Sequence, residues 1–182
     1  MNEPHSIESS FGVVQVSLEV RIAARPKRVW AALTRQTSKW WPREFYTAEK
    51  ARGFKIEPKV GGRMYEDWGD GDGRLWGLVI GLKTGAWIDL LGYLSPAYGG
   101  PAHTNFRFDI VRDGDASIVR VTDTIFGAVS GAKRDQTREG WRMLLEGALK
   151  PYVEASLNGK KKSKSKAGRK SKSPASASQA AP

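Results

Sequence analysis

The feature that most constrains the fold is a long amphipathic stretch near the end of the chain, from Ala132 to Leu157. Its apolar residues recur at three- and four-residue intervals, the spacing of one face of an α-helix: Trp141, Leu144, Leu145, Ala148, Leu149, Tyr152 and Val153. Burying these side chains is worth roughly 10 kcal/mol gross, an upper value because unfolded chains are partly collapsed. An isolated helix of this length is marginal in water. The stretch therefore predicts a helix that lies against a broad apolar surface formed by the rest of the chain.

The predicted helix contains an interruption at Pro151, which removes the backbone hydrogen bond to the carbonyl of Gly147. Gly140, Gly147 and Pro151 fall on one flank of the apolar stripe, where another element can approach closely. The sequence therefore predicts a bend near Gly147–Pro151.

Upstream of this helix the hydrophobic pattern is mainly that of β-strands. Val14 to Ile22 alternates strictly between apolar and polar residues, which indicates a half-buried strand. A helix is predicted from Pro26 to Thr34, and a short helical turn or loop follows at Ser38 to Pro42. Turns rich in Gly, Asp and Pro separate the remaining predicted strands, Phe54–Glu57, Arg63–Trp68, Leu75–Leu82, Ala86–Leu94, Thr104–Val111 and Ser117–Phe126.

The order of these elements predicts the fold class. Consecutive strands with short connections form an antiparallel sheet, and one amphipathic helix covering the sheet indicates an α+β protein. We expect a curved antiparallel sheet of about six to seven strands wrapped on the long C-terminal helix, with two short helices after the first strand. A long sheet curls, and a curled sheet closed by a helix leaves a space in which a ligand pocket is expected.

The charge of the chain is concentrated at its end. The sequence of 182 residues suits one domain with tails, predicted as a flexible N-terminus at 1–12, a folded domain at 13–157 and a disordered tail at 158–182. The tail holds eight of the basic residues and no acid, whereas the rest of the chain has 22 basic and 19 acidic residues. The Lys-rich part at 160–172 is either a solubilising tail or a non-specific contact for polyanions or anionic lipid, since no aromatic residue is interleaved for base stacking.

Several classes of site are excluded by composition. The absence of Cys excludes disulfides, thiolate metal sites and thiol catalysis. The only histidines are His5 and His103, and the acidic turn from Asp67 to Asp72 carries only part of a calcium-binding loop, so neither a metal nor a cofactor is predicted. With no signal-peptide pattern and no apolar run near the roughly 20 residues of a membrane span, a cytoplasmic protein is predicted.

An ordered set of short motifs resembles a known superfamily. The motifs are IAARPKRVWAALT from Ile22, the pair Trp40–Trp41, VGGRMYE from Val60, GRLWGLV from Gly73 and EGWRMLLEGALKPYVE from Glu139. Together they resemble the SRPBCC (START-like, helix-grip) superfamily and, within it, homologues of the activator of heat-shock protein 90 ATPase. The resemblance covers about Val14 to Ala155.

That resemblance implies the helix-grip fold with an internal cavity, and members that mostly bind hydrophobic small molecules. The superfamily includes lipid-transfer proteins, polyketide cyclases and a chaperone-activating domain. It has no universal catalytic residue, so the resemblance assigns none to this chain.

The residues themselves provide candidates for contact with a ligand. Large flat side chains either line a cavity or fill the core, and a few polar groups orient the ligand. The predicted ligand-binding residues are Trp40, Trp41, Tyr65, Glu66, Trp76, Trp87, Asp123 and Trp141.

Three carboxylates, those of Glu66, Asp89 and Asp123, fall on predicted apolar faces, where a carboxylate must be paired, protonated or near water. Asp123 is the strongest candidate for an acid–base group, because it is the only polar residue in its phase between Val119 and Ile125. The alternative is a solvent-exposed strand end or an ion pair with an arginine, for which the candidates are Arg63, Arg107 and Arg120.

Three functions remain open at this stage. The first is a binding module for a hydrophobic or aromatic small molecule in the cavity. The second is a polyketide cyclase or hydrolase-like enzyme on the same fold, with Asp123, Glu66 or Asp89 as acid or base. The third is a chaperone-associated or stress-response protein that acts through its surface, for which family naming alone is an analogy.

Overall fold

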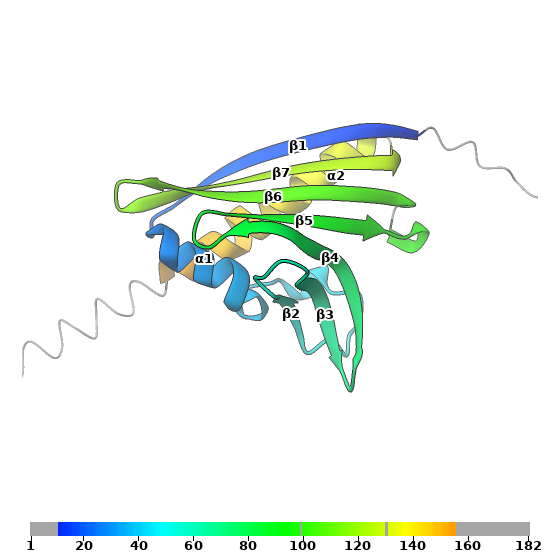
Figure 1. The fold of residues 1–182 in the computed structure, drawn as a ribbon, viewed down its shortest axis with the longest axis horizontal. Helices are drawn as coiled ribbons and strands as arrows, with labels where there is room; N and C mark the ends of the chain where they lie inside the picture. Colours follow the sequence, from blue (N-terminus) through cyan, green and yellow to red (C-terminus); the bar gives the residue numbers. More distant parts are fainter. Residues whose placement is uncertain (1–10, 99, 130, 156–182) are drawn as a thin grey trace, which may run out of the picture.

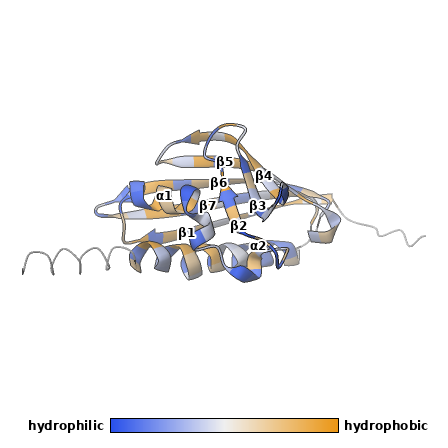
Figure 2. Ribbon diagram, turned by 90° about the horizontal axis from the view of Figure 1, so that it is seen from below, coloured by the Kyte–Doolittle hydropathy of each residue, from blue (hydrophilic) through white to orange (hydrophobic). Residues whose placement is uncertain are grey.

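The structure is a computed structural model that describes residues 11–98, 100–129 and 131–155. One antiparallel sheet of seven strands, in the order β1-β7-β6-β5-β4-β3-β2, makes up most of it. A long C-terminal helix runs along one face of this sheet (Figures 1 and 2). The predicted α+β class is confirmed, with a strand count at the upper end of the expected range. The tail at 158–182 lies outside the described residues, as does the N-terminal segment except for Phe11 and Gly12, which begin β1.

Each of the seven predicted strands is present, with bounds within a few residues of those expected. The strands are β1 (Phe11–Ile22), β2 (Gly53–Ile56), β3 (Arg63–Gly69), β4 (Asp72–Lys83), β5 (Trp87–Leu94), β6 (Ala102–Asp113) and β7 (Ala116–Ala128). The helical elements are α1 (Pro26–Arg35), η1 (Thr37–Lys39), η2 (Arg43–Phe45), η3 (Pro96–Tyr98), α2 (Gly131–Arg142) and η4 (Met143–Leu149). Helical structure continues after η4 to residue 155. Among the described residues, no helix is both long and apolar enough to cross a membrane.

Local sequence chemistry sets the ends of several elements. Pro26 occupies the first turn of α1, where its missing N–H has no hydrogen bond to lose. The connection between β3 and β4 turns through Gly69, Asp70 and Gly71, all with positive φ. This is the left-handed region that Gly adopts freely and Asp tolerates, so the acidic stretch forms a tight hairpin turn.

The predicted apolar stripe of the C-terminal helix is buried against the sheet. Leu145, Leu149 and Val153 are fully buried, and Leu144 nearly so. They belong to one core cluster with inward-facing residues of the strands and of α1, among which Ile88, Leu90, Val119, Val121, Val29 and Leu33 are buried. The helix is therefore held by the sheet, as its amphipathic pattern requires.

The interruption expected at Pro151 takes the form of a π-helical segment. The backbone N–H of Lys150 donates to the carbonyl of Leu145, five residues back. A wider turn of this kind, directly before Pro151, relieves the clash of the proline ring with the preceding turn. The bend itself stays a prediction, because a π-helical segment can widen a helix with or without bending it.

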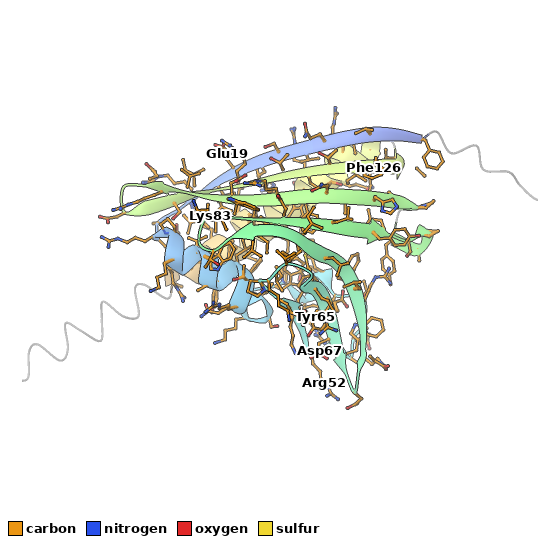
Figure 3. All side chains as sticks on the ribbon, in the orientation of Figure 1. Glu19, Arg52, Tyr65, Asp67, Lys83 and Phe126 are labelled. Carbon is orange, nitrogen blue, oxygen red and sulfur yellow. The ribbon has the colours of Figure 1, made fainter. Side chains whose placement is uncertain are left out.

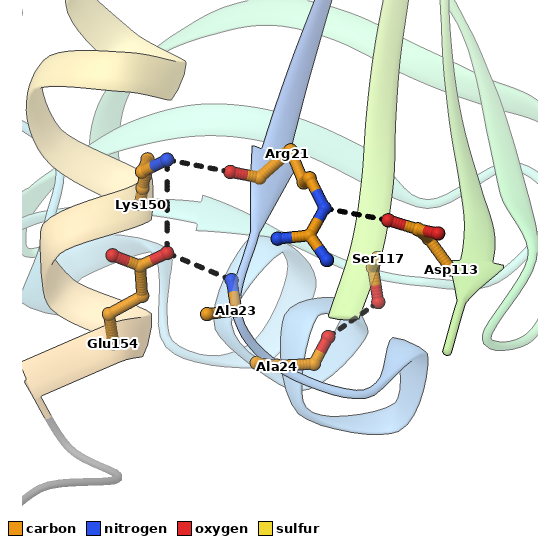
Figure 4. Close-up of polar contacts among 7 residues, drawn as sticks. All are labelled: Arg21, Ala23, Ala24, Asp113, Ser117, Lys150 and Glu154. Carbon is orange, nitrogen blue, oxygen red and sulfur yellow. Dashed lines mark hydrogen bonds and ion pairs between the residues drawn. The ribbon is translucent and has the colours of Figure 1, made fainter. Parts of the chain in front are cut away.

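Polar contacts fasten the C-terminal half of the helix to the end of β1 (Figure 4). Lys150 Nζ donates to the carbonyl of Arg21 at 2.8 Å, and a Glu154 carboxylate oxygen accepts from the backbone N–H of Ala23 at 2.8 Å. Arg21 in turn pairs with Asp113 in the β6–β7 hairpin. These contacts supplement the buried stripe and fix the part of the helix that lies beyond the π-helical segment.

The face of the sheet turned away from the helix is covered by cross-strand pairs. Arg107 of β6 pairs with Asp89 of β5 at 3.0 Å, and Arg120 of β7 pairs with Glu19 of β1. Arg107 also pairs within its own strand, with Asp109 at 2.9 Å. Near one end of this face His103 stacks on Phe126, with ring centroids 5.4 Å apart. Glu19 and Phe126 are labelled on this outer face in Figure 3.

We predict opposite effects of adding a methyl group at two glycines. At Gly147 a Cβ atom meets nothing within 4 Å, so Gly147→Ala should stabilise the protein by about 0.5–1 kcal/mol through reduced backbone entropy of the unfolded chain. At Gly92 a Cβ atom would lie 2.8 Å from the Trp76 carbonyl oxygen and 2.6 Å from a Thr104 methyl group. Gly92→Ala should therefore destabilise the protein by about 1–3 kcal/mol.

Urea unfolding of the two variants beside the unaltered protein measures both changes in the free energy of unfolding. A destabilised Gly147→Ala variant would show that the π-helical segment cannot accept a side chain at that position.

Candidate functional site

A cavity of about 240 Å³ lies between the inner face of the sheet and α2. Every strand except β1 contributes to its wall, together with the segment from Trp41 to Phe45 and the C-terminal helix. The lining residues are Trp41, Phe45, Phe54, Met64, Trp76, Leu94, Thr104, Phe106, Asp123, Ile125, Lys133, Thr137, Gly140, Trp141 and Leu144. Most of this lining is aromatic or aliphatic, with a small number of polar groups, the composition expected of a small-molecule site.

Two groups of aromatic rings make up the walls. Near η1, Trp41 stacks on Phe54 with ring centroids 3.8 Å apart and meets the edge of Phe45 at 6.3 Å. Beneath α2, Trp141 contacts Phe106 at 5.6 Å. These contacts hold flat apolar surfaces in fixed orientations before any ligand binds.

Asp123 is a buried carboxylate in the lining of the cavity, with 5% of its surface exposed. Thr104 Oγ1, on the neighbouring strand β6, donates to Oδ1, and Trp141 Nε1, on α2, donates to Oδ2 at 2.9 Å. Burial raises the pKa of the Asp123 carboxyl, and the two hydrogen bonds and the charge of Lys133 only partly oppose this rise. Asp123 is thus oriented from both sides and shielded from water.

The side of α2 that faces the cavity carries a row of two polar residues and one tryptophan. Lys133, Thr137 and Trp141 are spaced four residues apart and all line the cavity. Around them α2 is mostly exposed, whereas the following helical segment contributes the fully buried leucines. The first half of the helix therefore covers the cavity with two polar residues together with Gly140 and the Trp141 indole, and leaves the space beneath it unfilled.

Glu66, on β3, is fully buried beside the cavity and uses both carboxylate oxygens as acceptors. Trp76 Nε1 donates to Oε1 and Trp68 Nε1 donates to Oε2, each at 3.0 Å. The Thr47 hydroxyl donates to Oε2 at 2.8 Å, and the Thr47 backbone N–H lies 3.0 and 3.1 Å from the two oxygens. Glu66 therefore ties the loop after η2 to the sheet and fixes the indole of Trp76, which lines the cavity.

The structure brings together half of the predicted ligand-binding residues. Trp41, Trp76, Asp123 and Trp141 line the cavity, and Glu66 lies behind it through its bond to Trp76. Trp40 is buried instead in the core, where its Nε1 donates to the Ala32 carbonyl at 2.8 Å.

Tyr65 and Trp87, in contrast to the prediction, do not line this cavity. Strand alternation places Met64 and Glu66 on the inner face of β3, which turns Tyr65 outward beneath the guanidinium of Arg63 (Figure 3). In β5 the buried residues are Ile88, Leu90 and Gly92, so Trp87 faces outward, with the Arg107 guanidinium 4.2 Å from its ring centroid. Asp89 shares this outer face and pairs with Arg107, which is the ion-pair alternative for that carboxylate.

Sequence reasoning missed several residues of the lining and one residue behind it, for different reasons. Lys133 and Thr137 precede Trp141 at four-residue intervals on the same side of the helix. They could have been predicted by extending the apolar stripe toward the start of the helix and allowing polar residues in it. Thr104 lies opposite Ile125 in the β6–β7 register, which only the strand pairing reveals. Thr47 reaches Glu66 from a loop with no periodic signal.

A scan against protein-family models and a search of curated protein sequences give no match to this chain. Solved structures do match over most of its length. DynU16, from the dynemicin biosynthetic locus, has a TM-score of 0.58 and 19% identity over 78% of this chain and 48% of DynU16. CV1439 from Chromobacterium violaceum has a TM-score of 0.55 and 20% identity over 77% of this chain and 96% of CV1439.

A third match is Ara h 8.0201, with a TM-score of 0.58 and 11% identity over 78% of this chain and 98% of Ara h 8.0201. This chain has the helix-grip fold. It spans about half of DynU16 and nearly all of the other two proteins. At identities of 20% or less these matches show the shared fold, and the helix-grip architecture explains why a cavity lies between the curled sheet and its helix.

We predict that Glu66→Gln strongly destabilises this helix-grip domain. A glutamine has one acceptor oxygen and two N–H groups in place of the second, so half-buried donors of Thr47 or Trp68 would lose their partner. The expected loss is about 2–4 kcal/mol in the free energy of unfolding, measured by urea titration. The matched control is Glu19→Gln, at an exposed ion pair, which should cost less than about 1 kcal/mol. Equal effects would contradict the role of Glu66.

The raised pKa of Asp123 predicts a pH-dependent effect of Asp123→Asn. Because the folded pKa lies above the unfolded one, the stability linked to this group is fully present below the unfolded pKa and is lost as pH rises through the folded pKa. The asparagine side chain of the variant carries no charge at any pH, and its amide can still pair with Thr104 and Trp141. The Tm difference, variant minus unaltered protein, should therefore be more positive at about pH 7 than at about pH 4. A constant difference would contradict the raised pKa.

Proposed function

We propose that this chain binds an apolar, flat small molecule in the cavity beneath α2. The observation that carries the proposal is an aromatic-walled cavity of about 240 Å³ in which polar lining groups are few and pre-oriented. When such a cavity is empty, its lining side chains lack van der Waals contacts on one side, and a bound apolar ligand supplies them. Trp41 and Phe54 on one side and Phe106 and Trp141 on the other are arranged to contact ring faces.

The polar groups of the lining support a ligand that is not purely hydrocarbon. Asp123 and Thr104 belong to the sheet and Lys133 and Thr137 to the helix, so a ligand between the two elements meets polar groups from both. In addition, the Nε1 of Trp41 is buried without a hydrogen-bond partner among the described residues. A buried unpaired donor is costly, and a bound acceptor near this indole would remove the cost.

We further propose that the chain is a member of the SRPBCC superfamily, related to the homologues of the activator of heat-shock protein 90 ATPase. The helix-grip fold supports the first part, and the ordered motifs from Ile22 to Glu154 support the second. Under this proposal the cavity ligand, rather than a nucleic acid or a membrane, is the main partner of the domain.

The proposal predicts saturable binding of N-phenyl-1-naphthylamine, a neutral apolar probe that fluoresces when shielded from water. Gly140 lines the cavity, so Gly140→Leu should fill part of it and weaken binding at least about tenfold. The matched control is Gly147→Leu, on the same helix but outside the cavity, which should leave the affinity within about twofold. Fluorescence titration measures both.

Native mass spectrometry of freshly purified protein complements the titration, because a co-purifying small molecule would identify the natural ligand class. Absence of saturable probe binding, or equal weakening by the two leucine variants, would contradict the proposed function.

A further inference from the structure

We propose that the cavity also supports a reaction, in which Asp123 removes a proton from the carbon next to the carbonyl group of a flat cyclic ketone. This inference rests on the proposed binding function, because the ketone must first enter the cavity. It goes beyond that function by assigning an acid–base activity and a substrate class to named residues.

The position of the carboxylate carries the first step of the inference. Asp123 reaches the cavity from β7 and is one of its lining residues. Thr104 and Trp141 each donate one hydrogen bond, one to each carboxylate oxygen. A carboxylate oxygen has a second lone pair, so both oxygens keep acceptor capacity beyond these two bonds. Glu66 differs in this respect, since four donor groups share its two oxygens.

The second step concerns the negative charge that forms when such a proton is removed. The electron pair of the broken C–H bond moves toward the carbonyl, whose oxygen becomes an enolate oxygen. Lys133 and Thr137, which carry an ammonium and a hydroxyl group, line the same cavity from α2, and the charge of Lys133 acts on Asp123. Donors held in a water-poor site stabilise such an oxyanion strongly. The base thus comes from the sheet and the donors come from the helix.

The reaction is balanced without any further reactant. Asp123 accepts the proton as a carboxylate and becomes a carboxylic acid. It then returns a proton in one of two ways. If the O–H proton of Asp123 first exchanges with solvent, delivery to the same carbon gives hydrogen exchange, whereas delivery to another carbon of an unsaturated ketone gives a shifted double bond. Neither outcome requires an oxidant or a reductant.

The environment of Asp123 suits a base of this kind. Burial raises the pKa of Asp123, which makes its carboxylate a stronger base than an exposed one. Burial also means that little water has to be displaced from the carboxylate when a ketone binds. Lys133 is the charged group that acts on Asp123 from the helix, and its field partly opposes the rise. The aromatic rings of Trp76, Phe106 and Trp141 provide flat surfaces for a two-ring ketone beside the carboxylate.

The test uses 2-tetralone, a flat two-ring ketone with acidic C–H groups, dissolved with the full chain in D₂O. Proton NMR follows the loss of the C1 hydrogen signals as deuterium replaces them. We expect exchange at least about 100-fold faster than with the same concentration of acetate. The rate should rise with pH and level off at a pKa above that of an ordinary aspartate. A rate no greater than that with acetate would overturn the inference.

Variants assign the activity to its residues. Asp123→Asn should reduce exchange to background while leaving 2-tetralone binding, followed by quenching of Trp fluorescence, within about threefold. Asp89→Asn, on the outer face, is the matched control and should leave exchange unchanged. Retention of exchange in Asp123→Asn would overturn the assignment. If that variant does not fold, Lys133→Met serves as the test. We expect exchange to be at least about tenfold slower in Lys133→Met, and an unchanged rate would contradict the inference.

Failure of this inference is distinguishable from failure of the proposed function. Binding of 2-tetralone and of the fluorescent probe without exchange would leave the binding function intact and remove the reaction. Absence of binding by both compounds would overturn both.

Discussion

The contact between the C-terminal helix and the inner face of the sheet determines where every other feature of this structure lies. Leu145, Leu149 and Val153 are completely removed from water, and each provides roughly 1.5–3 kcal/mol of gross stabilisation. This burial is confined to the second half of the helix. The first half, α2, buries no aliphatic side chain of comparable size, and the cavity lies between it and the sheet. A cavity remains because one half of the helix is anchored by packing and the other half is not.

Two buried carboxylates occupy opposite roles within this arrangement. Glu66 is saturated by donors from a loop threonine and two indoles, so it acts as a rigid connection between segments far apart in sequence. Asp123 has a single donor for each oxygen and lies in the wall of the cavity, where burial raises its pKa. Four donor groups bond the first carboxylate and two bond the second, and the two only partly oppose the effect of burial on the pKa of Asp123. Candidate chemistry therefore concentrates at Asp123.

The sequence predicted the elements well because their signals are local and periodic. The alternation in β1, the glycines of the β3–β4 turn and the stripe from Trp141 to Val153 each specify a structure without help from distant residues. The site was predicted only in part, since a cavity depends on which face of each strand turns inward. Tyr65, Trp76 and Trp87 are all large aromatic residues in predicted strands, yet strand pairing turns Tyr65 and Trp87 outward. The contact between Thr47 and Glu66 could not be predicted from the sequence, because tertiary packing brings the two residues together.

The π-helical segment Met143–Leu149 joins the two halves of the helix and sets the angular phase between them. Each residue of an α-helix advances the side-chain direction by roughly 100°, so one additional residue accommodated in a wide turn rotates everything before it relative to everything after it. A series at four-residue spacing drifts by roughly 40° per step in an α-helix, and the wider turn offsets part of this drift. The cavity-facing Lys133, Thr137 and Trp141 and the buried Leu145, Leu149 and Val153 therefore stay on the side of the helix that faces the sheet. Deleting a single residue from this segment would keep the anchored half in place while turning a different side of α2 toward Asp123. The length of the chain at this point, and not only its composition, thereby decides which side chains the cavity contains.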